Sequence, residues 1–246
     1  MEGVEASAVS LLKRAVDLDN GGERLDEAAT LYQEGVSLLL TVMKDSSDPT
    51  KKGHLRDKIK QYLKRAEELK KFVNDQKEQG KYHEQIRIAA DSIGHSYNTL
   101  FARFIDERLT SVEVEDPYIR STHQIYNFLR FCELLVRKKT SLKRILLITS
   151  LDDQSGHDTQ KQRLGQIGHS LNKYGVLLKI EFSSTLHDRE IRFDNGWVIK
   201  IGRGLDIYRA TENKFDIGFC DYDLRPCHET TVDIFHRKNM KGGAGS

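Results

Sequence analysis

The stretch from Leu55 to Val73, LRDKIKQYLKRAEELKKFV, constrains the fold most, because its apolar residues follow a helical repeat. At about 100° per residue, they gather within a sector of roughly 80°. The residues of this stripe are Leu55, Ile59, Tyr62, Ala66, Leu69 and Val73. Lysine and glutamate side chains occupy the opposite side. The pattern therefore predicts an amphipathic helix that buries one face against other helices.

Leu63 belongs to neither face of this helix. Its side chain projects about 80° around the axis from that of Leu55, on the flank of the stripe. An apolar residue there can extend a wide core face, which is the ordinary role of a single flanking leucine. It can also line a groove beside a neighbouring helix. Periodicity alone leaves both interpretations open.

Two further amphipathic helices precede this one. The first is predicted over residues 6–19 and stops at Asn20-Gly21-Gly22, because glycine accepts the left-handed conformation that ends helices. The second is predicted over residues 25–44, where small residues such as Ala28 and Gly35 permit close helix approach. A turn containing Pro49 leads into the third helix. The three helices together predict a small antiparallel bundle.

This trio of helices resembles the MIT domain, which is found in proteins recruited to microtubules or to ESCRT-III filaments. The runs EAATLYQEGVSLLL and YLKRAEELK carry the resemblance, which covers about the first third of the chain. In that family, a groove beside the third helix receives a short amphipathic helix from the C-terminal tail of an ESCRT-III subunit. The resemblance implies that Ile59, Leu63 and Glu67 bind such a partner, with Leu63 at the centre of the groove.

Length and composition limit the alternatives. The chain has 246 residues, which suits two modest domains, and its net charge is only +2. We therefore expect no strongly basic surface of the kind that binds duplex DNA, and no nucleic-acid partner. The chain has only three cysteines, and such a small and odd number argues against a disulfide scaffold and fits a reducing compartment. The N-terminus lacks a secretory signal and no run is apolar enough to span a membrane, so we expect a cytoplasmic protein with peripheral membrane contact.

Composition also predicts the domain boundaries. The bundle is expected over residues 1–79, followed by a polar linker over residues 80–95 that begins with Gly80. The polar run that follows Val73 fits both a charged extension of the helix and a flexible linker. A second domain is expected over residues 96–240. The final stretch, residues 241–246, is glycine-rich and is expected to be a disordered tail.

The second domain alternates between helical and extended patterns. Residues 122–138 form the clearest helix, with Ser121 or Thr122 as its cap. The run LKRILLITS is typical of a strand buried on both faces, and Asn195-Gly196 predicts a type I′ hairpin turn. Other helices are expected at 96–109, 157–174 and 227–236, and other strands at 111–116, 176–184, 190–193, 197–202 and 215–223. This alternation predicts an α/β fold with a parallel or mixed sheet.

The spacing His187-x-Arg189-x-x-x-x-Asp194 resembles a degenerate phospholipase D motif, in which His-x-Lys-x-x-x-x-Asp supplies a nucleophile and a phosphate clamp. Arginine replaces the lysine, although it too can bind phosphate. The downstream Gly-Ser-x-Asn of the family is absent, and a single copy of the motif is present, whereas the chemistry needs two imidazoles. A hairpin with charged surface residues is therefore the simpler interpretation of these residues alone.

The C-terminal part as a whole resembles the phospholipase-D-like domain that accompanies an MIT domain in one small animal family. The runs EDPYIRSTHQIYNFLRFCELL and DLRPCHETTVDIFH carry this resemblance. It implies a catalytically silent domain that forms a homodimer and binds membranes, in a protein that acts in late cytokinesis at the midbody and on late endosomes. The alternative is a dimeric phosphodiesterase that pairs His187 from two chains.

Basic residues suggest how such a domain could meet acidic phospholipids, including phosphoinositides. The group comprises Lys138, Lys139, Lys143, Arg144, Lys200 and Arg203. Each exposed cation near an anionic leaflet contributes about 1 kcal/mol. By contrast, Cys220, Cys227, His228 and His236 match no zinc-ligand spacing, so neither a metal nor a cofactor is expected.

Overall fold

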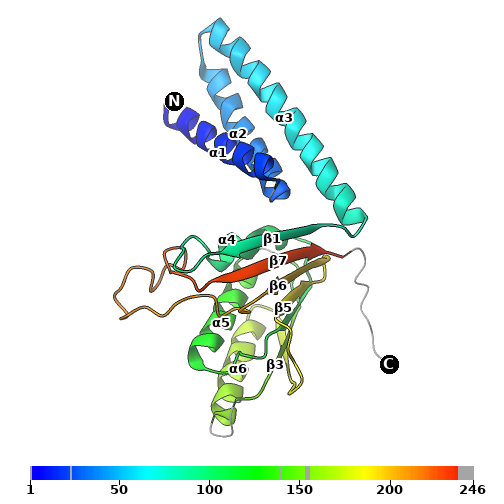
Figure 1. Ribbon diagram of the computed structural model, residues 1–246, viewed down its shortest axis with the longest axis vertical. Helices are drawn as coiled ribbons and strands as arrows, with labels where there is room; N and C mark the ends of the chain where they lie inside the picture. The colour runs from blue at the N-terminus through cyan, green and yellow to red at the C-terminus, as the bar shows by residue number, and fades with distance from the viewer. Residues whose placement is uncertain (1, 23, 139, 153–155, 238–246) are drawn as a thin grey trace. The chain divides into compact units, whose positions relative to one another are not determined.

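The computed structural model describes residues 2–22, 24–138, 140–152 and 156–237. The chain divides into two compact units, Met1–Glu84 and Gln85–Ser246 (Figure 1). The expected tail at residues 241–246 lies outside the described residues, as does Lys139. Each unit is described by itself below.

The first unit is the predicted helical bundle. Its helices are α1 (Glu2–Gly21), α2 (Leu25–Asp45) and α3 (Pro49–Glu78). Helix α3 begins earlier than the apolar stripe because Pro49 occupies its first turn and the Asp48 carboxylate accepts a hydrogen bond from the N–H of Thr50. It also continues past Val73 to Glu78, so the polar run after the stripe begins as a charged extension of the helix.

The apolar stripe of α3 packs as its period predicts. Five of its six residues are buried, and the sixth, Tyr62, is half-buried and stacks on Tyr32 of α2 with 5.6 Å between ring centroids. Gly35 permits the close approach of α1 and α2, because a Cβ there would lie 2.6 Å from Leu12. The core of the bundle is made of Ala8, Leu12, Ala15, Ala28, Ala29, Leu31, Tyr32, Val36, Leu39, Val42, Leu55, Ile59, Ala66 and Leu69.

The second unit is built on a mixed seven-stranded sheet with the order β1-β7-β6-β5-β2-β3-β4 (Figure 1). Strands β2, β3 and β4 are parallel, whereas the pairs β2–β5, β5–β6 and β6–β7 are antiparallel. The strands are β1 (His83–Ile88), β2 (Ser111–Glu115), β3 (Arg144–Thr149), β4 (Leu177–Phe182), β5 (Glu190–Phe193), β6 (Trp197–Ile201) and β7 (Thr230–His236). The mixed sheet confirms the predicted fold class.

Helices α5 (Thr122–Arg137) and α6 (His157–Asn172) connect the parallel strands. Because right-handed crossovers that step in the same direction place their helices on one face, both pack on the same side of the sheet. Strand β3 reflects this arrangement: Ile145 and Leu147 are buried, whereas Leu146 and Ile148 on the other face are only half-buried. The prediction that this strand is buried on both faces was therefore wrong.

Four local predictions fail for identifiable reasons. The expected linker at 80–95 contains β1, an edge strand. The expected helix at 227–236 is β7, since Thr230, Val232 and Ile234 are buried at a period of two. The expected strand at 215–223 is part of a loop. The expected helix at 96–109 is a short α4 (Tyr97–Phe101) and a 3₁₀ turn, η1 (Ala102–Phe104).

The β5–β6 hairpin is present, but its turn is not type I′. That type needs positive φ at both Asn195 and Gly196, and here only Gly196 has it, with φ 103°. The N–H of Gly196 donates to the carbonyl of Phe193 at 3.0 Å, which makes a three-residue connection ending in a glycine. Asn195 instead donates its amide to the carbonyl of Phe104.

Candidate functional site

Polar contacts show which neighbour each flank of α3 faces. The guanidinium of Arg65 binds both carboxylate oxygens of Asp19 on α1, at 2.8 and 2.7 Å. The ammonium of Lys70 binds the side-chain oxygen of Gln33 on α2 at 2.7 Å. Lys70 lies seven residues after Leu63, about two helical turns on, so the two share a flank. Leu63 therefore lies on the α2 side of α3.

Leu63 is 38% exposed, which excludes it from the core of the bundle. Ile59, one turn earlier, is 6% exposed and belongs to that core. It is the most buried of the three residues predicted to contact a partner. Glu67, one turn later, is exposed. The structure thus places an apolar side chain and a carboxylate in line on the flank that faces α2.

The residues of the degenerate phospholipase D motif are not brought together. His187 is exposed, and Arg189 stacks on the ring of Tyr118, with 4.2 Å from its guanidinium carbon to the ring centroid, while donating to the carbonyl of Gly202. Asp194 lies at the opposite end of β5, where its carboxylate accepts the N–H of Thr110 at 3.0 Å. Asp194 therefore anchors a turn and does not face the two basic residues.

The predicted lipid-binding residues also occupy separate places. Lys138 and Lys143 lie in the α5–β3 connection, and Arg144 begins β3. Lys200 lies on β6, where its ammonium is 3.5 Å from Glu190. Arg203 follows β6, at the edge where β2, β3 and β6 end. We call this edge the carboxyl edge; the residues do not form one continuous patch.

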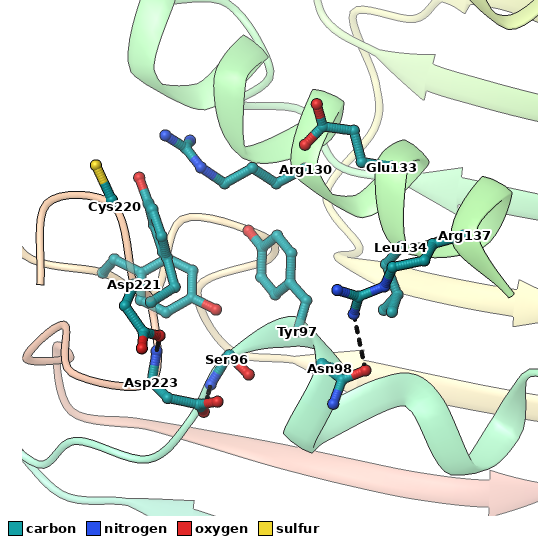
Figure 2. Close-up of a pocket in the computed structure, with 12 residues that line it drawn as sticks. Ser96, Tyr97, Asn98, Arg130, Glu133, Leu134, Arg137, Cys220, Asp221 and Asp223 are labelled. Atoms are coloured by element: carbon teal, nitrogen blue, oxygen red, sulfur yellow. Dashed lines mark hydrogen bonds between the residues drawn. The ribbon is translucent and has the colours of Figure 1, made fainter.

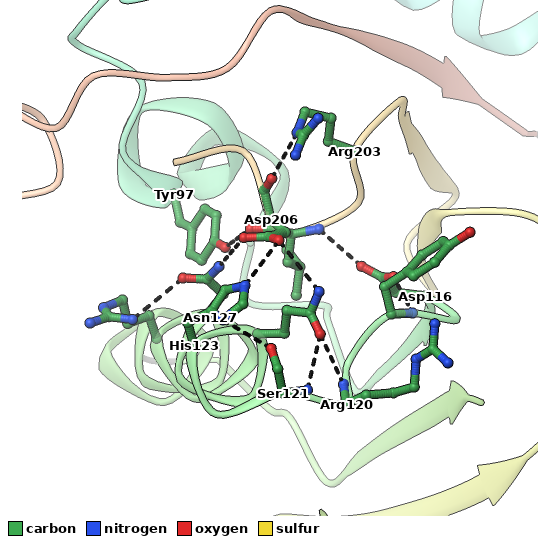
Figure 3. A network of polar contacts seen from close by, with 12 residues as sticks. Tyr97, Asp116, Arg120, Ser121, His123, Asn127, Arg203 and Asp206 are labelled. Carbon is green, nitrogen blue, oxygen red and sulfur yellow. Dashed lines mark hydrogen bonds and ion pairs between the residues drawn. The ribbon is translucent and has the colours of Figure 1, made fainter. Parts of the chain in front are cut away.

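A polar network joins three segments at the carboxyl edge (Figure 3). The buried carboxylate of Asp116, directly after β2, accepts the N–H groups of Tyr118 and Leu205. The carboxylate of Asp206 accepts amide N–H groups from Asn127 at 3.1 Å and Gln124 at 3.4 Å, both on α5. These bonds fix the β2–α5 and β6 loops against the start of α5.

Burial raises the pKa of Asp116, although the two N–H groups that it accepts oppose the shift. We call the contact between Asp116 and the loop after β6 the Asp116 lock. Gly204 is part of it, because its φ is +60° and any Cβ there would overlap the Asp116 carboxylate. Burial, and then the nearby guanidiniums of Arg203 and Arg209, lower the pKa of His228, although the carboxylates of Asp206 and Asp91 oppose the shift.

Sequence reasoning missed Arg120 at this edge. Its guanidinium carbon lies 5.2 Å from the ring of Tyr118, on which Arg189 also stacks. Among the described residues, no carboxylate forms an ion pair with Arg120, Arg189 or Arg203. Such guanidiniums can bind phosphate oxygens in pairs. The usable signal was position, since α/β sheets bind ligands beyond the carboxyl ends of their strands.

A hollow of about 390 Å³ lies between α4, α5 and a loop that contains Cys220 to Asp223 (Figure 2). Arg130 of α5 stacks on the Tyr222 ring at 4.1 Å, and Arg137 donates to Asn98 at 2.9 Å. Although burial opposes it, hydrogen bonds from Ser96 and Thr99 lower the pKa of Asp223. The pocket lining combines aromatic rings with two arginines and three acidic residues, which are Glu133, Asp221 and Asp223.

The cysteines and histidines considered as metal ligands are scattered. Cys227 is buried, Cys220 is exposed, and His236 lies against Trp197. In the part of the chain that the structure describes, no three histidine, cysteine or acidic side chains gather as metal ligands do. No helix within the described ranges is both long and apolar enough to cross a bilayer.

Comparison with known proteins assigns both units. Residues 5–71 match the model of the MIT (microtubule interacting and transport) domain, and residues 94–236 match the phospholipase D-like domain at the C-terminus of MIT. The chain belongs to the family of MIT proteins with a C-terminal phospholipase-D-like domain. A mouse relative, MIT domain-containing protein 1, is 51% identical over 96% of this chain and 94% of its own length. This MIT protein therefore has the two-domain organisation that the sequence runs indicate.

Proposed function

We propose that this MIT protein is a non-enzymatic adaptor that binds the C-terminal helices of ESCRT-III subunits through the flank of α3 that faces α2. MIT domains in general bind such tails. The observation that carries the proposal is Leu63, an apolar side chain left 38% exposed between α2 and α3. An incoming amphipathic helix would cover it, and Glu67, one turn on, would pair with a basic residue of that helix.

The test replaces Leu63 with aspartate in the full chain. The expected result is loss of binding to a panel of ESCRT-III C-terminal peptides, measured by fluorescence anisotropy, with unchanged thermal melting. The melt should not change because an exposed position tolerates a charge. Phe72→Asp is the matched control, since Phe72 is 50% exposed and lies about 180° around α3. It should bind normally.

Two results would contradict the proposal. A collapsed melt for Leu63→Asp would mean that this side chain stabilises the fold, because a buried aspartate costs several kcal/mol. Normal peptide binding by a folded Leu63→Asp variant would place the tail elsewhere on the bundle.

The second half of the proposal concerns the phospholipase-D-like domain. It binds acidic phospholipid headgroups as a homodimer, and the protein acts as a cytoplasmic, peripheral membrane adaptor in abscission at the midbody and on late endosomes. The guanidiniums of Arg120 and Arg203 at the carboxyl edge, which form no ion pair with a carboxylate of the described residues, support headgroup binding. A dimer would present two bundles and two basic edges, so weak single contacts would act together.

A phosphodiesterase that pairs His187 from two chains is the competing function. The position of Arg189 does not favour it, because the guanidinium is already stacked on Tyr118 and bonded to a carbonyl. The separation of Asp194 from this edge also weakens the resemblance to an active motif. We therefore assign the domain a binding role.

A further inference from the structure

The loop between β6 and β7 holds two large apolar side chains in solvent. We define this tip loop as residues 209–226, closed at its base by a bridge between Tyr208 and Cys227. Phe215 is 99% exposed and Ile217 is 83% exposed. Leaving such side chains in water forgoes roughly 1.5–3 kcal/mol each. Two large apolar side chains exposed this close together mark a surface that a partner can cover.

The tip loop is ordered by a buried cation. The guanidinium of Arg225 donates to the carbonyls of Gly218, Phe219 and Arg209 at 2.5, 2.7 and 3.2 Å. It also lies 4.6 Å from the ring centroid of Tyr222. These contacts hold the base of the loop, so Phe215 and Ile217 project from a built scaffold.

A groove between α5 and α6 supplies the complementary shape. It consists of two adjoining hollows of about 300 Å³ and about 250 Å³ that share Leu129, Ile167 and Ser170. Exposed tyrosines, Tyr126 and Tyr174, line opposite parts of it. The remaining apolar lining consists of Ile125, Cys132, Val136 and Leu171. We call this the α5–α6 groove.

The charges of the tip loop and of the groove are complementary. The part of the tip loop around Phe215, residues 211–217, which we call the tip, carries two acids and one cation, which are Glu212, Asp216 and Lys214. The groove carries two cations and one acid, which are Arg163, Arg137 and Glu133. Arg163 lies in one hollow, and Glu133 and Arg137 line the other. An anionic membrane would instead repel the acidic residues of the tip.

The position of the loop limits how it can reach such a groove. Its residues 220–223 line the pocket beside α5, with Arg130 stacked on Tyr222, so the loop base is fixed near the helices of its own chain (Figure 2). A twofold axis near this pocket would carry each tip across to the helices of a second copy. Both contacts would then form at once, as twofold symmetry requires.

We propose that the tip loop is an exchanged dimerisation arm, which inserts Phe215 and Ile217 of one chain into the α5–α6 groove of a second copy. The proposal rests on the homodimer of the proposed function and names its interface. An aromatic side chain alone buries about 150–250 Å². Two exchanged tips, with the groove surface that they cover, therefore approach the area of about 1,200 Å² found in stable interfaces.

The test measures the oligomeric state of the full chain by sedimentation at micromolar concentration. The double variant Phe215→Ser with Ile217→Ser and the groove-filling variant Ser170→Trp should each dissociate, with at least about a tenfold rise in the dimer dissociation constant. Ser170 is exposed, so tryptophan there leaves the fold intact. Leu177→Ser is the matched control, because Leu177 is 62% exposed on β4, and this variant should stay dimeric.

Mixing the two variants is the decisive step. A heterodimer retains one intact pairing, between the tip of the Ser170→Trp chain and the groove of the tip variant, so association should return on mixing. Two monomeric variants that stay monomeric when mixed would overturn the exchange. A tip variant, or a Ser170→Trp variant, that remains a dimer would overturn it as well.

Two further outcomes separate this inference from the proposed function. A tip variant that stays dimeric but no longer binds vesicles of phosphatidylcholine and phosphatidylserine would assign the tip to the bilayer and overturn the arm. A wild-type chain that sediments as a monomer would overturn both the arm and the proposed homodimer. Tail binding through Leu63 would then stand or fall by its own assay.

Discussion

At the scale of single residues, Gly204 has the sharpest consequence. Alanine there would hold a positive φ that L-residues disfavour, and its Cβ would overlap the Asp116 carboxylate. We expect Gly204→Ala to lower the free energy of unfolding by at least about 2 kcal/mol, measured by urea denaturation. Gly165→Ala, at an exposed position of α6 where a Cβ meets nothing within 4 Å, should leave stability unchanged or raise it by up to about 1 kcal/mol. Equal free energies of unfolding for the two variants would contradict the role of Gly204 in the Asp116 lock.

His187 gives the second prediction at this scale. We expect the purified chain to hydrolyse a chromogenic phosphodiester no faster than buffer, because phospholipase D chemistry needs two imidazoles and a free phosphate clamp. The His187→Ala variant is the control for any signal. Hydrolysis that disappears in this variant would instead establish the competing enzyme.

At the scale of elements, the contact between α1 and α3 should respond to acid. A hydrogen bond from the guanidinium of Arg65 lowers the pKa of Asp19 below its ordinary value of 3.8. Burial, and then the charge of the Asp19 carboxylate, raise the pKa of Tyr32 to about 12. Because the folded pKa of Asp19 is depressed, its contribution is complete above the ordinary value and is lost as the pH falls through the folded pKa.

Arg65→Met should therefore lower stability by up to about 1 kcal/mol at pH 6, because solvent screens the Arg65 side chain, which is 47% exposed, although the Asp19 side chain is only 10% exposed. The difference from the wild type should shrink as the pH falls below about 4, measured by calorimetry of the full chain. A difference that persists at acid pH would mean that Arg65 acts by packing. Lys64→Met, whose partner lies 3.9 Å away on the same helix, should show little change.

Helices and strands were predictable from the sequence where the spacing of apolar residues follows a single period. The 3.6-residue stripe predicted α3, and the capped run at Ser121 predicted α5. Strand β7 was missed because CHETTVDIFH contains helix-compatible residues, and its period of two is expressed only through pairing with β6. The alternating apolar residues at 215–223 predict a strand, yet Arg225 holds this part of the tip loop through backbone carbonyls that no local pattern shows.

At the scale of the whole molecule, the two-domain organisation followed from the sequence, but the surface did not. The basic residues predicted to bind lipid lie at different edges of the sheet, because residues that begin and end one strand are separated by its length. Arg120, Tyr118 and Arg189 meet only through the pairing of β2 with antiparallel β5. A sequence reading cannot place such partners without the strand order.

The prediction at this scale concerns membranes. We expect the full chain to bind vesicles containing phosphatidylserine, less tightly as salt is raised, because exposed cations carry the contact. Charge reversal of Arg120 and Arg203 should weaken binding more than reversal of Lys138 and Lys143 in the α5–β3 connection. The opposite order, measured by vesicle co-sedimentation, would move the contact to that connection.

Strand β1 has a practical consequence for taking the protein apart. Only residues 79–82 separate α3 from β1, so a fragment of the second domain that starts at Ser96 would lose an edge strand of its sheet. Strand β7 would then present bare N–H and C=O groups, which recruit other chains. Such a fragment would self-associate through the unpaired backbone groups of β7 and would be mistaken for a native oligomer. A fragment that begins at Lys81 or earlier retains β1 and keeps β7 paired.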